Sequence, residues 1–337
     1  MKIRNVYSNI FLTLVLTICL SCNSGNTSDN NPNDEAVDIT NAIFTEQSSD
    51  CFDYAEIYSS MVKDIQNSTN FEGAVEIETG TSDCTISVNG IPNHDFNDVT
   101  ASFATRVSEV GRVFKVSRFP VLNDQPTALS QQYYDAIMLN GVVADILSAG
   151  CYDPNSNMAD EDGNTAIGCN VNDGWLLDPL GTESKFGADS HNAHTQPDGT
   201  YHYHGDPKAM FNDEPRENGS PVIGFAADGF PIYGSYFLDS ETSTVRKAVS
   251  GYELIAGSRP GPDVNDPGGT YDGTYIDDYE FTGSGDLDEC NGMTVNGQYG
   301  YYITDTYPWM IACYSGTPDP SFSKGMPKEK LDHDHFH

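Results

Sequence analysis

The stretch that decides the fold is NAHTQPDGTYHYHGDP, residues 192–207. Its centre, Gln-Pro-Asp-Gly at 196–199, is a strong turn signal, because proline and glycine adopt the backbone angles that turns require. After the turn, tyrosine and histidine alternate, and an alternation with a period of two is typical of a β-strand. The stretch therefore predicts a β-hairpin whose second strand carries the Tyr-His repeat.

The repeat sorts its side chains onto two faces of the predicted strand. Successive residues of a strand point to opposite sides, so Tyr201 and Tyr203 share one face. His202 and His204 share the other. Residues two apart on one face lie about 6.5–7 Å apart at Cα, which lets two imidazoles reach one metal ion. The alternative is that the repeat decorates a half-exposed strand and binds nothing.

The loop length of the hairpin decides which earlier histidine joins the pair. A three-residue loop sets His194 across from His202. A two-residue loop sets His191 across from His204. In either register a third histidine lies beside the pair on the neighbouring strand. The spacing therefore favours a metal site built from three or four histidines.

The chemistry of the donors narrows the choice of metal. Imidazole suits zinc, copper, nickel and iron, and the cysteines of an exported chain are expected to be oxidised. A transition metal is therefore the expected cofactor, with copper or zinc first. Tyr201 and Tyr203 are candidates for supporting the histidines from outside the ligand set or for ligating directly, although buried tyrosine more often packs.

Short β-rich runs recur from residue 72 onward, several of them closed by Gly or Asn-Gly. The composition, with 31 Gly and 19 Tyr, also favours a protein rich in turns and strands. We expect a mostly β protein, either all-β or a β-rich α+β fold. It would form a compact β-sandwich or barrel-like domain with long ordered loops and disulfides. The runs include VEIETG (75–80), TISVNG (85–90), RVFKVSRFPV (112–121) and AIMLNGVVADIL (136–147).

Six cysteines remain once Cys19 and Cys22, near the N-terminus, are set aside. An even number of cysteines in an exported chain indicates disulfides. Several connectivities are open, and sequential pairing is favoured because it closes short local loops. The expected disulfides are Cys51–Cys84, Cys151–Cys169 and Cys290–Cys313.

Residues 1–21 are expected to be a signal peptide for export. A short basic region precedes the apolar stretch NIFLTLVLTICL at 9–20, which is too short to span a bilayer as a mature helix. Ser21 and Cys22 follow, and this pair resembles the lipobox of bacterial lipoproteins, in which the cysteine carries the lipid. The protein is therefore expected at the cell envelope, lipid-anchored through Cys22 to the outer membrane or cell surface, or else secreted.

The rest of the chain divides into four parts. Residues 22–45 are acidic and polar and are expected to form a flexible tether. Residues 46–71 are expected to form a helical segment, because apolar residues recur at roughly helical spacing across 51–68. A β domain is expected over 72–321. Residues 322–337 are expected to form a polar tail rich in His and Asp.

The charge of the chain bears on its partners. With 16 basic and 50 acidic residues, the net charge is −34, which repels nucleic acid, so we exclude a nucleic-acid partner. An acidic surface attracts cations instead. Two oxygen-rich loops are weaker candidates for calcium: Asp153, Asn155, Asn157, Asp160 and Asp162 in the first, and Asp263, Asp266 and Asp272 in the second.

Several segments, in their order along the chain, resemble the bacterial YHYH domain family, which is named for the motif found here at 201–204. The likeness runs from about residue 75 to about residue 321. The resemblance implies an exported bacterial protein and puts His94 in the same domain as the later histidines, so His94 joins the candidate ligands. It implies no settled activity. The segments include NGIPNHDF (89–96), LDPLG (177–181), GFAADGFPIYG (224–234) and GDLDECNG (285–292).

Three classes of function are open from the sequence. The first is capture or buffering of a transition metal by His94, His194, His202 and His204. The second is a metal-dependent hydrolase or oxidoreductase whose metal keeps an open position, with Asp228 as the candidate general base. The third is a calcium-stabilised adhesion or glycan-binding module. Partners other than the metal ion and the membrane stay open.

Overall fold

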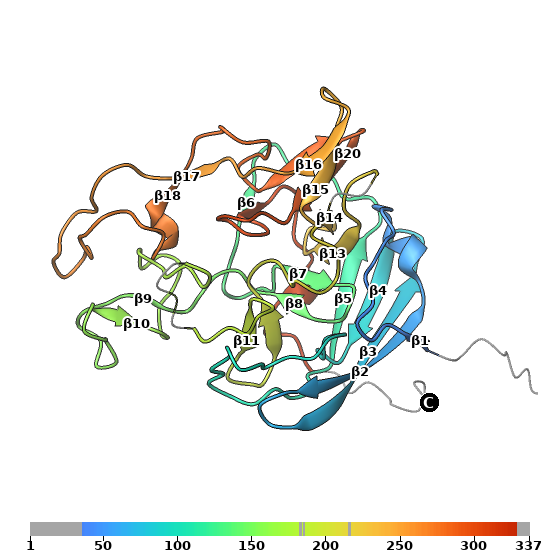
Figure 1. Cartoon of the computed structure of the whole chain (residues 1–337), viewed down its shortest axis with the longest axis horizontal. Coiled ribbons are helices and arrows are strands. Elements are labelled where there is room, and N and C mark those ends of the chain that lie inside the picture. The colour runs from blue at the N-terminus through green and yellow to red at the C-terminus, as the bar shows by residue number, and fades with distance from the viewer. Residues whose placement is uncertain (1–35, 182–183, 185, 215–216, 329–337) are drawn as a thin grey trace, which may run out of the picture. The chain divides into compact units, whose positions relative to one another are not determined.

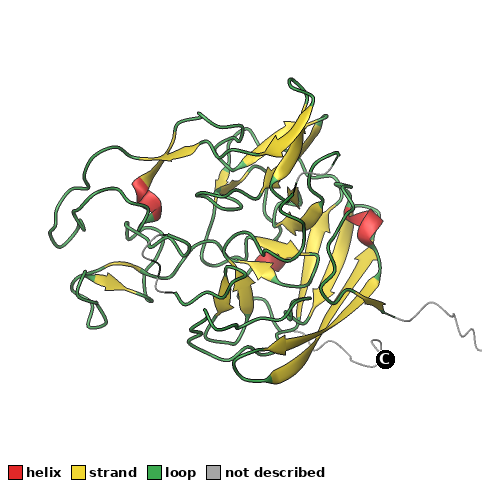
Figure 2. Ribbon diagram, viewed as in Figure 1, coloured by secondary structure: helices red, strands yellow, loops and turns green. Residues whose placement is uncertain are grey.

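The computed structural model describes residues 36–181, 184, 186–214 and 217–328. The expected signal peptide and Cys22 lie outside these residues. Regular structure within the described ranges is almost entirely β-strand, as predicted (Figure 2). The helical segments described there are three short 3-10 turns. None of these turns has the length and apolar character that crossing a membrane requires. These turns are η1 (Cys51–Tyr54), η2 (Ile276–Asp278) and η3 (Pro320–Phe322).

A five-stranded sheet occupies the first part of the described chain (Figure 1, blue to cyan). Its strands lie side by side in sequence order, and all neighbours are antiparallel except the first pair, which is parallel. Sequential antiparallel strands need only short turns. The strands are β1 (Val37–Asp38), β2 (Ile57–Asp64), β3 (Thr69–Thr79), β4 (Asp83–Val88) and β5 (Arg112–Ser117).

An eight-stranded sheet follows, in the order β11-β12-β8-β7-β13-β14-β20-β19. It is mixed, because β12 runs parallel to β8 and β14 runs parallel to β20. Its edges are β11 and β19, so it is open rather than a closed barrel. The strands are β7 (Ala136–Met138), β8 (Val143–Ala144), β11 (Ala193–Thr195), β12 (Tyr201–Tyr203), β13 (Val222–Ala226), β14 (Pro231–Tyr233), β19 (Gly292–Val295) and β20 (Gln298–Tyr302).

The remaining strands form two-stranded ladders joined by long loops. All four ladders are antiparallel. Their partners are β6 (Thr127–Ala128) with β21 (Cys313–Tyr314), β9 (Cys151–Tyr152) with β10 (Asn164–Thr165), β15 (Tyr236–Asp239) with β16 (Thr244–Lys247), and β17 (Tyr252–Leu254) with β18 (Tyr279–Phe281).

The two large sheets share one hydrophobic core, to which both contribute buried Val, Ile, Phe and Tyr side chains. The β7–β8 turn shows how closely they approach. Gly141 in this turn has a φ of +86°, and a Cβ at that position would lie 2.7 Å from Cγ2 of Val75 in β3. Only glycine combines this backbone angle with so little space. The Asn-Gly turn signal therefore marks a contact between the sheets as well as a change of direction.

The helix expected across 51–68 is wrong. Only η1 is helical there, and the next residues form β2, which pairs with β3 at eight positions from Ile57–Glu76 to Asp64–Thr69. Side chains alternate along β2, with Val62 buried and Met61 61% exposed. Pairing with a distant strand overrode a weak helical pattern, as is common for segments rich in β-branched and aromatic residues.

The expected tether and tail are each shorter than the sequence indicated. In the tether, Ile39 is buried and its N–H donates to Ser59 O at 2.8 Å. In the tail, the Phe322 side chain is fully buried, and Lys324 N–H donates to Gln132 O at 2.9 Å. Apolar residues near the two ends therefore extend the core beyond the predicted boundaries. Residues 329–337 lie outside the described residues.

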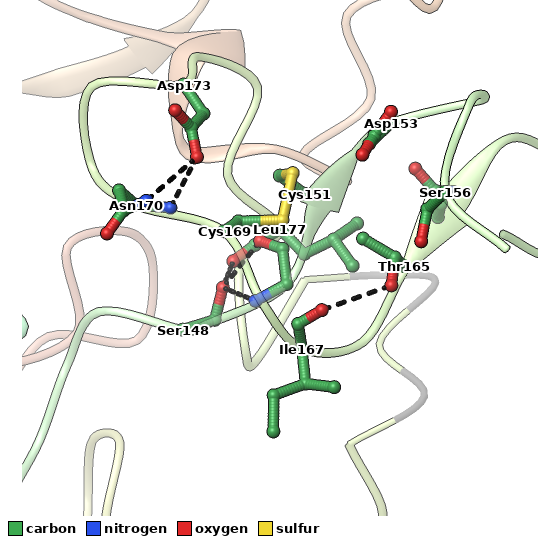
Figure 3. The surroundings of a disulfide bond; sticks show 12 residues. Ser148, Cys151, Asp153, Ser156, Thr165, Ile167, Cys169, Asn170, Asp173 and Leu177 are labelled. Carbon is green, nitrogen blue, oxygen red and sulfur yellow. Dashed lines mark hydrogen bonds between the residues drawn. A yellow bond between two sulfur atoms is a disulfide. The ribbon is translucent and has the colours of Figure 1, made fainter. Parts of the chain in front are cut away.

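All three expected disulfides are present: Cys51–Cys84, Cys151–Cys169 and Cys290–Cys313. They differ in where they lie. Cys151 and Cys169 form a small cluster with Leu176, separate from the main core. Figure 3 shows this bond beside Ser148, whose hydroxyl donates to Leu177 O at 2.8 Å. Cys290, in contrast, is part of the main core.

This difference predicts unequal effects of removing the two later disulfides. They close loops of similar sequence separation, 18 and 23 residues, so chain entropy alone gives each about 3 kcal/mol. We expect the double variant Cys290→Ala/Cys313→Ala to lower the midpoint of global unfolding. The double variant Cys151→Ala/Cys169→Ala should mainly speed amide hydrogen exchange within 151–169. Equal loss of global stability would show that the outlying loop unfolds with the core.

Candidate metal centre

The β11–β12 hairpin adopts one of the two registers that the sequence left open. Its register pairs His194 with His202, and Gln196 N–H donates to Thr200 O at 2.9 Å across a three-residue loop. This register places His194, rather than His191, beside His202 and His204. Gly199 in the loop has a φ of +87°, which explains why a glycine ends the turn.

Three imidazoles converge on one face of this hairpin. His194, His202 and His204 each offer a ring nitrogen, and these three nitrogens all lie within 4.8 Å of one another. Nε2 of His194 and Nε2 of His204 are 3.0 Å apart. Donor atoms this close can share one ion with bonds of about 2 Å. The only other set of this kind within the described residues, Asp50 with Cys51 and Cys84, contains the two sulfurs of a disulfide.

Backbone carbonyls fix which nitrogen of two rings faces the cluster. Nδ1 of His194 lies 2.7 Å from Phe186 O, and Nδ1 of His202 lies 3.3 Å from Thr200 O. A carbonyl only accepts, so both Nδ1 atoms must carry the hydrogen. In a neutral ring, Nε2 then keeps its lone pair. This arrangement, in which the outer nitrogen donates to a carbonyl, is the usual support for a metal-ligating histidine.

Burial keeps the three rings neutral. His202 and His204 are each 3% exposed, and this desolvation lowers the pKa of both well below the ordinary value for histidine. Desolvation also lowers the pKa of His194, which is partly exposed. Neutral imidazole is the form that binds metal. The cluster is therefore in its metal-binding form at neutral pH.

Unsatisfied polar atoms gather around the cluster. Within the described residues, six buried side-chain atoms have no hydrogen-bond partner, and two of them are Nδ1 of His204 and Oδ1 of Asp145, whose carboxylate interacts electrostatically with His194. Buried polar atoms are nearly always paired, so a local excess of unpaired ones calls for an explanation. Convergent ring nitrogens, with free lone pairs on Nε2 of His194 and of His202, fit a metal ion.

Asp145 is a member of this neighbourhood that the sequence did not single out. It follows β8, and its N–H donates to Tyr203 O at 3.0 Å. Its Oδ2 accepts from Gln196 Nε2 and forms an ion pair of 2.6 Å with Lys324 Nζ. A signal was present, because an aspartate interrupts the otherwise apolar run GVVADIL at 141–147.

His94 and His191, both candidate ligands, lie on the opposite face of β12. Nε2 of His94 is 2.6 Å from the hydroxyl of Tyr203, whose side chain points away from those of His202 and His204. The ring centroids of His94 and His191 are 3.7 Å apart. The structure thus divides the expected four-histidine set: His194 joins the pair on β12, and His94 does not. His94 belongs to the same domain as His202 and His204, but it lies on the other face of β12.

Tyr201 and Tyr203 pack in the core rather than against the three histidines. Tyr201 donates to Asp189 Oδ2 at 2.8 Å, and the hydroxyl of Tyr203 accepts from Asn140 Nδ2 at 2.9 Å. Burial raises the pKa of both phenols well above the ordinary value, so both stay protonated. Their role is to fix β12 between its neighbours.

Asp228, the candidate general base, is engaged elsewhere. It lies in the predicted β13–β14 turn, and its Oδ2 accepts from the hydroxyl of Tyr301 at 2.5 Å and from Gly316 N–H at 2.8 Å. Its Oδ1 accepts from Phe230 N–H at 3.3 Å. These contacts tie the turn to β20 and to the segment after β21. The carboxylate is thus a structural acceptor.

The acidic loops border a cavity of about 650 Å³ that Asp160, Asp162, Asp272 and Arg259 help to line. Their carboxylates shape the loops themselves. Oδ1 of Asp160 accepts from the N–H groups of Asp162 and Asn164, and Oδ1 of Asp263 accepts from the N–H groups of Asn265 and Asp266. Calcium binding here stays a prediction.

The burial of His94 predicts a pH dependence of stability. Burial lowers its pKa to about 3, whereas the unfolded chain titrates near 6.5. Below pH 6.5 the unfolded state therefore binds one more proton, so the contribution of His94 to the unfolding free energy falls by about 1.4 kcal/mol per pH unit. We expect the unfolding free energy to fall less with acid in His94→Gln than in the native protein, as measured by urea denaturation between pH 7.5 and 5. Equal slopes would contradict the neutral buried state.

Comparison with known proteins agrees with the resemblance seen in the sequence. The family model described as YHYH protein matches residues 113–316, which include Asp145 and all three clustered histidines but not His94. Neither the curated proteins nor the solved structures contain a match to this chain. The matched residues span more than half of the sequence and contain the motif at 201–204. The chain therefore belongs to the YHYH protein family.

Proposed function

We propose that this protein binds a transition metal ion, copper or zinc first, through His194, His202 and His204, and that it captures or buffers this ion at the cell envelope. One observation carries the proposal: three neutral imidazoles, two of them buried and one partly exposed, bring their ring nitrogens within 4.8 Å of one another. Imidazole is a common ligand for both metals.

The geometry without an ion supports this proposal further. Because Nδ1 of His194 donates to a carbonyl, its Nε2 presents a lone pair to Nε2 of His204, 3.0 Å away. If Nε2 of His204 carries the hydrogen, then its buried Nδ1 becomes an acceptor with no donor. If Nδ1 carries the hydrogen, two lone pairs face each other. A cation between the rings would turn that repulsion into coordination.

The location of the protein is part of the proposal. Three disulfides indicate that the chain folds in an oxidising compartment outside the cytoplasm. The lipobox-like Ser21-Cys22 supports attachment to a membrane through a lipid on Cys22. A metal-binding domain placed there would meet ions before they enter the cell.

A metal-dependent enzyme is a second candidate, favoured by two observations. Three protein ligands leave a position open on a metal that takes four, as in catalytic zinc sites. The Phe186 ring packs against His194, with centroids 5.9 Å apart, and also lines the cavity of about 650 Å³. A metal-activated water near this cavity would suit hydrolysis. Calcium-stabilised adhesion depends instead on the acidic loops.

Single histidine variants test the metal site directly. We expect His202→Ala to weaken zinc or copper binding by more than about 100-fold, because losing a ligand should exceed the 10–100-fold effect of losing an outer partner. His191→Ala is the matched control, since it removes an imidazole from the opposite face, and it should leave the affinity unchanged. Competition titration with a chromophoric chelator gives both numbers. Equal affinities for native protein, His202→Ala and His191→Ala would rule out the proposed site.

A further inference from the structure

We infer that Asp145 is the fourth ligand of the centre and binds the ion through Oδ1, so that the site holds a divalent cation with three imidazoles and one carboxylate. The inference rests on the proposed function. It adds a residue outside the Tyr-His motif and a preference for one class of metal ion.

Strand pairing places Asp145 beside the cluster. Its carboxylate lies outside the group of donor atoms that are within 4.8 Å of one another, so ligation requires a movement of this side chain or of the rings. β8 runs parallel to β12, with Val143 opposite His202 and Ala144 opposite Tyr203. Neighbouring strands keep their side chains in register, so the next residue, Asp145, shares a face with His204. The hydrogen bond from Asp145 N–H to Tyr203 O continues this pairing beyond the strand end. The fourth group and two of the histidines therefore come from adjacent strands.

The two carboxylate oxygens of Asp145 are in different situations. Oδ2 is held by Gln196 Nε2 and by Lys324 Nζ. Oδ1 has no hydrogen-bond partner, although the residue is only 4% exposed. An ionised oxygen left unpaired in the interior is costly. Metal-ligating carboxylates are often oriented by hydrogen bonds to their other oxygen, which is the arrangement found here.

Charge supports the same assignment. Three neutral imidazoles bring no negative charge, so a divalent ion bound by them alone would bury two positive charges. The Asp145 carboxylate is paired with Lys324 through Oδ2, and ligation through Oδ1 would place its negative charge between the ion and that ammonium group. Asp135 lies close by, with Oδ2 accepting from Ile146 N–H at 2.7 Å, and is a second buried carboxyl group beside the site. Lys324 is the cation paired with Asp145.

The donor set selects a class of metal. Carboxylate oxygen is a hard ligand that suits divalent ions, whereas Cu(I) prefers soft sulfur donors and tolerates imidazole. A centre of three histidines and one aspartate should therefore prefer Zn²⁺, or Fe²⁺ or Mn²⁺, to Cu⁺. Without the carboxylate, three histidines would make no such distinction by charge.

The test compares the affinities of the full-length protein for Zn²⁺ and Cu⁺, each added alone and measured by chelator competition. We expect Asp145→Asn to weaken Zn²⁺ binding at least about 10-fold and to change Cu⁺ binding much less, because the amide keeps the shape and loses the charge. Asp178→Asn is the matched control. Asp178 is also buried, but both of its oxygens accept from Trp309 Nε1, and Zn²⁺ affinity should not change.

Failure of the inference can be told apart from failure of the proposed function. If His202→Ala abolishes Zn²⁺ binding while Asp145→Asn leaves it unchanged, the histidine site stands and the fourth ligand is wrong. If neither change matters, both are wrong. A crystal structure of the Zn²⁺-loaded native protein decides the matter even if Asp145→Asn does not fold. Asp145 Oδ1 should lie about 2.0–2.2 Å from the ion, and a separation beyond bonding distance would overturn the inference.

Discussion

The alternation of side chains along β12 is the constraint on which the rest of the site depends. This strand is paired on both sides, by β11 and β8, and both of its faces are buried. A slip of one residue would exchange the faces and bury the tyrosines where the histidines converge. Pairing on both sides prevents such a slip. The histidines are therefore held as rigidly as core residues.

The two faces of β12 have different roles, one in packing and one in the candidate metal site. On one face Tyr201 packs against Phe96, with ring centroids 5.4 Å apart, and Tyr203 binds His94 and Asn140. The contacts with Phe96 and His94 join the eight-stranded sheet to the segment between β4 and β5 of the five-stranded sheet. The other face is left to His202 and His204. Stability on one side thus permits an arrangement of unpaired nitrogens on the other, which by itself would not stabilise the fold.

The sequence was informative where the relevant contacts are local. The Pro-Asp-Gly turn and the two-residue period predicted the hairpin and placed His194 across from His202 as one of two registers, and the short loops between cysteines predicted the disulfides. Pairing between strands that are distant in the sequence could not be predicted from it. Residues 57–64 form a strand because β3 pairs with them, not because of their own pattern. Asp145 reaches the histidines only through the β8–β12 ladder, and His94 reaches Tyr203 from a distant loop.

The central claim is that His194, His202 and His204 hold one metal ion. X-ray absorption at the metal edge of the loaded native protein tests it most directly, because imidazole rings give a distinctive outer-shell scattering pattern. The account predicts one bound ion per chain, with nitrogen or oxygen neighbours at about 2.0–2.2 Å and the scattering of three imidazoles. A protein that takes up no ion, or a spectrum without imidazole scattering, would contradict it.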